Sequence, residues 1–301
     1  MSLHRLVLAT LTTTFVLLLW GGFVHVTESS LACPDWPLCF GEFFPEMKGK
    51  VAIEHGHRLL AATVGLLTIG IVVGSWRMKA QDIGLHRMAW FALFLVVFQG
   101  LLGGITVIYR LPTVVSTAHL TLGSFFFCVL IWLAFRTRPG PAGDPVLEVV
   151  RWAKIGTGFV FVQLVLGALV RHTGAGLVCN NDMWLCNGHW WPTLAHWDPI
   201  PLQMARLHMI HRGMAMVVTV VVVWIAVCSA RRGKEMGRPD LARWALVGPV
   251  LVLAQVILGM FTVHSFISIP VVMAHLAGAE LLLAHQWSLA LFATGRRGAS
   301  S

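Results

Sequence analysis

The sequence has few charged residues and no long polar segment. Only 12% of its 301 residues are Asp, Glu, Lys or Arg, whereas 57% are hydrophobic. Soluble domains carry about twice this share of charged residues. The composition therefore excludes a soluble globular protein, and it leaves no stretch long and polar enough to fold as a separate soluble domain.

Apolar segments of the length that crosses a bilayer as a helix, about 20 residues, occur throughout the chain. They cover approximately residues 6–26, 54–76, 88–108, 116–135, 152–172, 206–228, 244–263 and 271–293. The first segment lacks a clear small-residue cleavage site and has a partner later in the chain, so we expect a membrane helix there rather than a signal peptide. The sequence thus predicts an all-α integral membrane protein with eight transmembrane helices.

The distribution of positive charge predicts the orientation in the membrane. If the N-terminus lies in the cytoplasm, most of the 22 Lys and Arg residues fall in cytoplasmic segments, Arg296 and Arg297 among them. Because cytoplasmic loops are enriched in Lys and Arg, we expect both termini on that side. The net charge of +9 then indicates contact with anionic membrane lipid and not with nucleic acid.

The two halves of the chain share sequence motifs. The matches pair residues 21–24 with 167–170 and residues 99–103 with 255–259. Each half contains four predicted helices, so both copies have the same orientation, as in a parallel repeat about an axis along the membrane normal. We therefore expect two pseudo-symmetric four-helix bundles, formed by residues 1–140 and 141–301.

Four of the 14 histidines stand out by position, namely His57, His119, His211 and His275. Each lies about four to six residues inside an even-numbered predicted helix. These helices run in the same direction, so we expect the four imidazoles at one depth near the outer face. An ionisable ring in hydrocarbon requires a partner, and haem iron between facing helices is a common one. The repeat predicts two bis-histidine haem sites, His57 with His119 and His211 with His275.

Charged residues beside these histidines suggest how such sites work. Arg58 and Arg212 each follow a histidine near the outer interface, where a guanidinium either pairs with a haem propionate or extends toward lipid headgroups. Glu54 aligns with His208, so a carboxylate stands beside one site only. Glu54 shares a helix face with His57, and we interpret it as a proton-handling residue. The alternative is a helix-start carboxylate at the positive end of the helix dipole.

The two long loops predicted to face outward, approximately residues 27–53 and 173–205, each contain one pair of cysteines. The pairs are Cys33 with Cys39 and Cys179 with Cys186. The outer compartment is oxidising, so disulfide bonds are expected. They act either as structural links in loops with little core or as redox-active pairs that exchange with a partner thiol. Metal binding is a weaker interpretation because the spacing within each pair is wide.

Taken together, these residues resemble a known family. Glu54-x-x-His57-Arg58, His119, His211-Arg212 and His275, with a cysteine-bearing outer loop, are similar to haem A synthases, the CtaA/Cox15 family, over essentially the whole chain. The resemblance implies an eight-helix bundle made of two four-helix halves. It also implies an oxidoreductase that converts a methyl substituent of haem O to the formyl group of haem A, for cytochrome oxidase.

The resemblance also assigns roles to individual residues. It implies that His211 and His275 bind the iron of a haem b cofactor, that His57 and His119 bind the substrate haem, and that Glu54 is the acidic residue beside the substrate. Oxidising an unactivated methyl group requires a redox cofactor, because no side chain is a strong enough oxidant. The chemistry implied by the resemblance therefore agrees with the pattern of histidines.

The resemblance extends to the loops and the partners. Cys33 and Cys39 match loop cysteines of bacterial members, whereas Cys179 and Cys186 match a pair that only some members have. We expect the Asp-Trp-Pro sequence after Cys33 to help cover the haem edge. The implied partners are haem O, membrane lipid, haem O synthase and cytochrome oxidase assembly factors, in a bacterial cell membrane with the haem sites near the outer face.

Three other functions remain open from the sequence. A dihaem b-type cytochrome usually needs haems at two depths to bridge about 30 Å of hydrocarbon, whereas the four histidines are predicted at one depth. A non-catalytic haem carrier or assembly protein explains the histidines and cysteines but not the difference between Glu54 and His208. A transporter fits a parallel repeat, but the sequence shows neither broken midplane helices nor a polar cavity.

Overall fold

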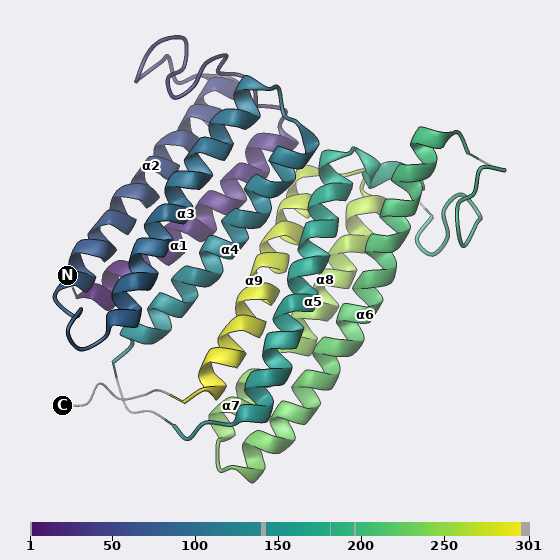
Figure 1. The fold of residues 1–301 in the computed structure, drawn as a ribbon. Helices are drawn as coiled ribbons and strands as arrows, with labels where there is room; N and C mark the ends of the chain where they lie inside the picture. The colour runs from purple at the N-terminus through teal and green to yellow at the C-terminus, as the bar shows by residue number, and fades with distance from the viewer. Residues whose placement is uncertain (1, 140–142, 181, 196, 296–301) are drawn as a thin grey trace. The chain divides into compact units, whose positions relative to one another are not determined.

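The computed structural model describes residues 2–139, 143–180, 182–195 and 197–295. Arg296 and Arg297, which the charge distribution placed in the cytoplasm, lie outside the described residues. Within the described part the chain is helical and contains no strand (Figure 1). The helices are α1 (Leu3–Val26), α2 (Gly49–Trp76), α3 (Ile83–Ile108), α4 (Thr113–Thr137), α5 (Leu147–His172), η1 (Ala175–Leu177), α6 (Pro199–Glu235), α7 (Pro239–Ala245), α8 (Val247–His264) and α9 (Ile269–Ala293).

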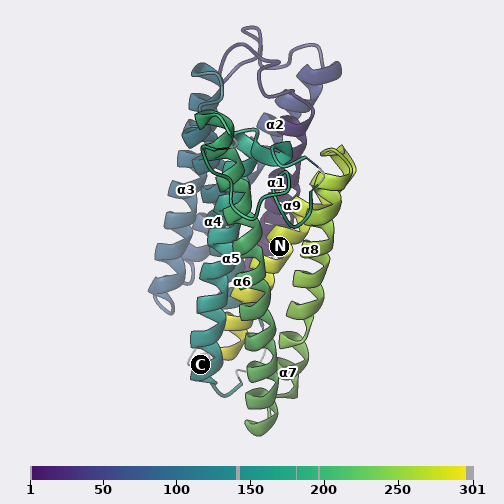
Figure 2. The ribbon, with the colours of Figure 1, turned by 90° about the vertical axis from the view of Figure 1, so that its right-hand side faces the viewer.

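Among the described residues, eight helical segments are long and apolar enough to cross a membrane. The short helix α7 runs directly into α8, and the two together form one such segment, Pro239–His264 (Figure 2). Each of the other α-helices forms a segment of its own. The predicted all-α membrane fold with eight transmembrane helices is therefore confirmed.

The helices begin earlier than the apolar pattern predicted, and for two of them the difference concerns the predicted site. α2 begins at Gly49 rather than near residue 54, and α6 begins at Pro199 rather than near residue 206. Pro199 suits the first turn of a helix, where its missing N–H costs nothing. The 37 residues of α6 extend about 55 Å, well beyond the hydrocarbon thickness of about 30 Å. His57 and His211 thus lie further from their helix starts than predicted, and that part of the prediction is wrong.

The described residues form two compact units, 2–139 and 143–295. In the first unit α1 contacts both α2 and α4, and α3 contacts the same two helices. The four helices therefore close into a ring (Figure 1). As a result, α2 and α4 lie across the diagonal of the bundle.

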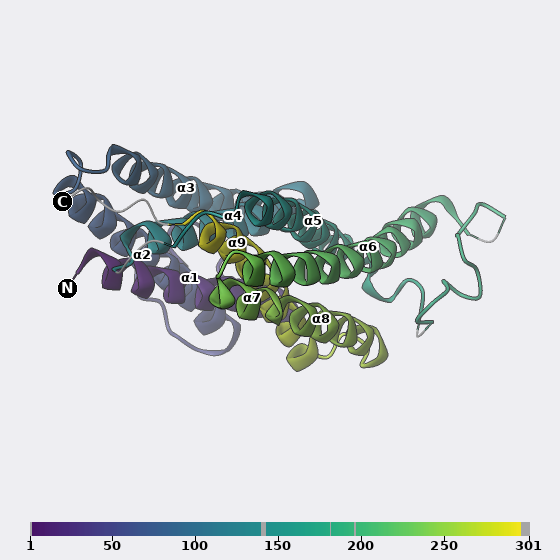
Figure 3. The same ribbon diagram turned by 90° about the horizontal axis from the view of Figure 1, so that it is seen from below.

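The second unit has the same order of neighbours. α5 contacts α6 and α9, and α8 contacts the same two helices, so α6 and α9 lie across the diagonal. The loop between α5 and α6 extends beyond the end of α6 (Figure 3). The units thus share their contact pattern, while a symmetry axis that relates them stays a prediction.

The most tightly packed core of each unit lies at one end of its bundle. In the first unit the fully buried side chains include Val7, Ile71, Leu85 and Leu133. In the second unit they include Val149, Ile225, Leu241 and Leu289. On α4 the core residue Leu133 is near the end of the helix, whereas His119 is near its start. The same holds for Leu289 and His275 on α9. The predicted site residues therefore lie toward the end of each bundle opposite to its core.

Candidate functional site

In the first unit, each predicted ligand histidine packs against a glycine of a neighbouring helix. A Cβ added to Gly21 of α1 would lie 3.1 Å from Cε1 of His57, and one added to Gly103 of α3 would lie 3.4 Å from Cε1 of His119. Such distances are at or below ordinary van der Waals contact. The two glycines therefore allow the imidazoles to approach the backbones of α1 and α3.

The second unit repeats this arrangement. A Cβ on Gly167 of α5 would lie 3.1 Å from Cε1 of His211, and one on Gly259 of α8 would lie 3.3 Å from Cε1 of His275. All four predicted ligand histidines thus have a glycine beside the ring. For a single histidine this contact would be ordinary packing, but its recurrence indicates a common requirement for space next to the imidazole.

Each unit brings together the two members of its predicted pair. His57 on α2 and His119 on α4 are close enough for their charges to interact, and the same is true of His211 on α6 and His275 on α9. In both units the paired histidines come from helices across the diagonal. This is the arrangement in which helices of a bundle present ligands to a shared cofactor.

The ring nitrogens differ in their hydrogen-bond partners. Nδ1 of His211 lies 3.2 Å from Nε2 of Gln163. Nδ1 of His57, His119 and His275 is buried and makes no hydrogen bond of good geometry. The last two rings lie beside backbone carbonyl groups: His119 beside that of Gln99, and His275 beside that of Gln255. Buried polar atoms are normally paired, so imidazoles that the protein leaves largely unpaired fit ligands of a metal centre.

Glu54 and Arg58 tie α2 to the first long loop. Glu54 is 3% exposed; its Oε1 accepts a hydrogen bond from Nη2 of Arg58 at 2.5 Å, and its Oε2 accepts one from the backbone N–H of Cys33 at 2.8 Å. Nη1 of Arg58 donates to the carbonyls of Asp35 and Leu38, at 2.8 and 2.5 Å. Arg58 is thus directed into the loop and not toward lipid headgroups.

Arg212 makes the corresponding contacts in the second unit. Its Nη1 donates to the carbonyls of Asp182 and Leu185, at 2.7 and 3.0 Å, while its Nη2 is buried without a partner. His208, which aligns with Glu54, is 4% exposed and lies beside the carbonyl of Ala175. The second unit therefore keeps the arginine that holds the loop but lacks the carboxylate.

Both predicted disulfides form, between Cys33 and Cys39 and between Cys179 and Cys186. An aspartate inside each loop organises the chain around its disulfide. Asp35 accepts hydrogen bonds from the N–H groups of Gly41 and Phe40, at 2.8 and 2.7 Å, and these donors hold the pKa of its carboxyl group below the usual value.

Asp182 has the same role in the second loop. It accepts from the N–H groups of Gly188 and Leu185, at 3.0 and 2.9 Å. These donors lower the pKa of its carboxyl group as well. The two loops therefore share an aspartate that is ionised at neutral pH and fixes the local turn.

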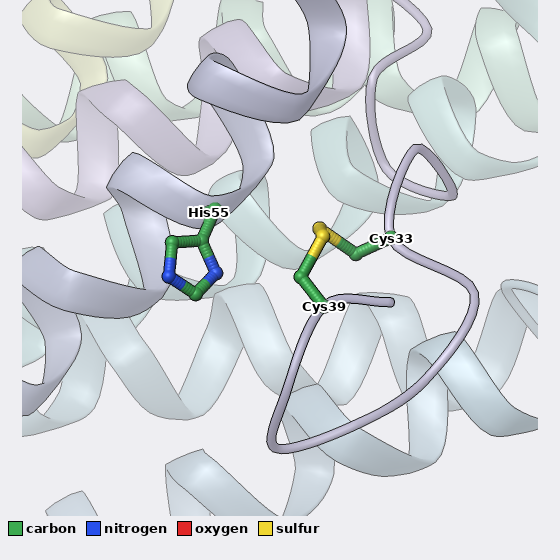
Figure 4. Close-up of side chains that lie close together, drawn as sticks. All are labelled: Cys33, Cys39 and His55. Carbon is green, nitrogen blue, oxygen red and sulfur yellow. A yellow bond between two sulfur atoms is a disulfide. The ribbon is translucent and has the colours of Figure 1, made fainter. Parts of the chain in front are cut away.

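His55 is a residue that the sequence interpretation missed. It lies beside the first disulfide (Figure 4), and its ring nitrogen and the two sulfur atoms are within 4.8 Å of one another. The sulfurs are bonded to each other, so they offer no thiolate to a metal. Nε2 of His55 lies 2.9 Å from the carbonyl of Phe43. The residue thus supports the loop, and only its position next to Glu54 in the sequence pointed to it.

Trp36 extends the first loop to the candidate site. A Cβ added to Gly104 of α3 would lie 2.7 Å from Cδ2 of Trp36, so the indole rests on the helix backbone at that glycine. Gly104 follows Gly103, which contacts His119. Trp36 therefore packs one residue along α3 from the glycine that faces His119, and the expectation that the Asp-Trp-Pro segment covers the haem edge stays a prediction.

The second unit has a cavity at the aligned position. Met183 aligns with Trp36, and Met260 aligns with Gly104. Both methionines line a cavity of about 300 Å³ together with Ile257, Phe261 and His264. The C-terminal end of α8 is thus less completely covered by its disulfide loop than the C-terminal end of α3.

Comparisons with known proteins agree with this geometry. Residues 4–287 match the model of the COX15-CtaA family, described as cytochrome oxidase assembly protein. The chain is 31% identical over 269 residues to the heme A synthase of Symbiobacterium thermophilum, which covers 86% of this chain and 84% of the relative. It is 30% identical over 202 residues to that of Shouchella clausii (61% and 65%) and 25% identical over 269 residues to that of Lysinibacillus sphaericus (86% and 85%).

Proposed function

The chain belongs to the COX15-CtaA family, and we propose that it is a haem A synthase, an oxidoreductase that converts a methyl substituent of haem O to the formyl group of haem A in a bacterial membrane. Relatives with that activity in their names align with most of the chain, and the eight membrane-spanning helices agree with it. The observation that carries the proposal is the set of four histidines in two pairs, each ring against a glycine.

The residues of both units fit a haem. In each unit two imidazoles come from helices across the diagonal, and the glycines beside them leave space that a Cβ would fill. Bis-imidazole ligation needs two facing rings in surroundings of low polarity. We assign His211 and His275 to a resident haem b, and His57 and His119 to the substrate haem.

Bound haem supplies the redox chemistry that oxidation of an unactivated methyl group requires. The residues of the first unit orient the substrate and handle protons. Glu54 precedes His57 by less than one helical turn, and its Oε1 contacts only one donor, Nη2 of Arg58. We assign Oε1 to hold or move a proton beside the substrate. Breaking its one hydrogen bond, to Arg58, makes Oε1 available, while Oε2 keeps its bond to the N–H group of Cys33.

The two arginines differ as candidates for binding a haem propionate. Arg58 has both terminal nitrogens engaged, by Glu54 and by two loop carbonyls. Arg212 has a buried Nη2 without a partner. A charge-assisted bond to a propionate would satisfy this donor, so Arg212 is the stronger candidate and Arg58 contributes mainly after rearrangement of Glu54.

The remaining assignments concern the surroundings of the enzyme. The charge distribution supports cytoplasmic termini and haem sites near the outer face. In that orientation both disulfide loops face an oxidising compartment. Haem O synthase is the expected source of substrate, and the family description connects the product with assembly of cytochrome oxidase.

Haem extraction tests the function directly. The protein is expressed with and without a haem O synthase and purified in detergent, and its haems are extracted with acid and separated by chromatography. We expect haem O together with haem A or a hydroxylated intermediate only when the synthase is present. Haem b alone under both conditions, at two equivalents per chain, would instead identify an electron-transfer cytochrome and overturn the proposal.

A further inference from the structure

The four helices that carry the glycines differ at one position. One turn before the glycine, three of them have a glutamine: Gln99 before Gly103 on α3, Gln163 before Gly167 on α5, and Gln255 before Gly259 on α8. The fourth helix, α1, has Leu17 before Gly21. The histidine that faces α1 is His57. Among the four predicted ligands, His57 is thus the one without this amide on its neighbouring helix.

Gln163 shows what the amide does in the second unit. Its Nε2 lies 3.2 Å from Nδ1 of His211 and donates to the backbone carbonyl of the same residue at 3.0 Å. Its Oε1 is buried and has no partner. The side chain of Gln163 therefore reaches across from α5 to α6 and fixes the edge of the imidazole that points away from the site.

Leu17 provides no such contact in the first unit. It is a partly buried residue of the apolar core, and its side chain has neither a donor nor an acceptor. Nδ1 of His57 is buried without a partner. His119 and His275 at least lie beside backbone carbonyls. The ring of His57 is thus held only by packing against Gly21 and its other neighbours.

The tautomer of a metal-bound histidine explains why this matters. An imidazole that ligates iron through Nε2 carries its proton on Nδ1, and an acceptor for that proton orients the ring and makes it a better ligand. Rotation of the Gln163 amide supplies the acceptor: Oε1, which is buried without a partner, then meets the Nδ1–H group, and Nε2 gives up its bond to the His211 carbonyl. Loss of such a partner typically lowers metal affinity by about 10-fold to 100-fold.

We propose that Gln163 is a positioning residue that retains haem on His211, and that Leu17 leaves His57 as an exchangeable ligand. This inference rests on the proposed function, in which one site keeps its haem and the other takes in substrate and releases product. The amide on α5 and the leucine on α1 then distinguish a permanent site from a transient one within otherwise similar bundles.

Haem release measures the proposed difference. The purified protein is loaded with haemin, and transfer of haem to excess apomyoglobin is followed by absorbance. The His57→Ala and His211→Ala variants assign the fast and slow phases to the two units. We expect the first unit to release haem at least tenfold faster than the second.

Substitutions at Gln163 and Leu17 test the proposal most directly. Gln163→Met, which keeps the length of the side chain, should speed release from the second unit roughly tenfold, and Leu17→Gln should slow release from the first by a similar factor. Val162→Gln and Val16→Gln serve as controls, because these neighbouring side chains are 49% and 44% exposed and place an amide away from the histidines.

The low-spin ferric EPR signal provides a readout that a purely structural role would not change. Gln163→Met should shift the signal of the second site and Leu17→Gln that of the first, whereas the controls should shift neither. Equal release rates from both units in the unmodified protein would overturn the inference. Unchanged rates and spectra in Gln163→Met with His211 still ligated would do the same.

This test is independent of the proposed reaction, since it uses haemin and needs no haem O. If the Gln163→Met and Leu17→Gln substitutions change the release rates as expected but no haem A forms during co-expression with the synthase, the inference stands and the proposed function fails. If haem A forms normally but the two substitutions change neither the release rates nor the EPR spectra, the function stands and the inference fails.

Discussion

The disulfide loops of the two units are held by equivalent arginines, but these arginines have different neighbours. Arg58 and Arg212 both donate to carbonyls of a disulfide loop. Only Arg58 also contacts a carboxylate, that of Glu54; in the second unit His208 occupies the aligned position. Both loops form, so the second loop closes its disulfide without a carboxylate at the position that aligns with Glu54. Glu54 also supports its own loop through Cys33, and we propose that its other carboxylate oxygen serves the chemistry of the first unit.

Replacing the predicted ligand histidines should have the largest effect and should distinguish the two units most clearly. We expect His211→Ala to lose haem b and all haem A formation, because the resident cofactor loses an iron ligand. His57→Ala should keep haem b and lose haem A formation, since only the substrate site is affected. Pyridine haemochrome spectra of the purified variants measure the haem content. Loss of haem b in His57→Ala with retention in His211→Ala would reverse the assignment of the two units.

Replacing the residues that differ between the units should have the next largest effect. Glu54→Ala should reduce haem A formation at least 100-fold, within the range for loss of a general acid or base, while haem b content stays near one equivalent. His208→Ala is the matched control and should retain most activity. The yield of haem A in membranes from co-expression measures both. Normal yield from Glu54→Ala would contradict the assigned role.

Filling the space beside one ligand should have a smaller, local effect. Gly167→Ala puts a methyl group 3.1 Å from Cε1 of His211, so we expect haem b occupancy to fall severalfold. Gly158→Ala on the same helix has nothing within 4 Å and should leave occupancy unchanged. Both variants gain about 1 kcal/mol of helix propensity, so a difference between them reports the contact with the ring. Equal occupancy in the two variants would show that the glycine is not needed for space.

The loop aspartates should give the smallest effect, visible in its dependence on pH. The N–H groups of Gly41 and Phe40 lower the pKa of Asp35, so its carboxylate stabilises the folded loop above the unfolded pKa, and this contribution disappears as pH falls through the folded pKa. Asp35→Asn should therefore lower the melting temperature at pH 7, and this difference should shrink as the pH falls through the lowered pKa of the folded state and the carboxyl group becomes neutral. Thermal unfolding at pH 7, 5 and 3 tests this. A pH-independent difference would contradict it, and Asp182→Asn should behave alike.

The sequence predicted the fold better than the fine structure of the sites. Helix number and type followed from the apolar segments, because a membrane-spanning backbone must satisfy its hydrogen bonds within a helix. The starts of α2 and α6 were misplaced because both helices continue past the hydrophobic stretch. The histidine pairs were found because the motif occurs twice. His55 and Gln163 were not assigned to the loop or to His211, since those contacts join segments far apart in the chain.

The sequence by itself determined the membrane fold, the disulfide partners and the pairing of His57 with His119 and of His211 with His275. These features depend on local composition and on an internal repeat, and both can be recognised from the order of residues alone. Only the tertiary structure decided that Arg58 holds a loop, that a glycine faces each imidazole, and that Gln163 reaches His211 while Leu17 gives His57 no partner. The physical reason is that hydrogen bonds and van der Waals contacts act over a few ångströms, so they are fixed only when distant helices pack together.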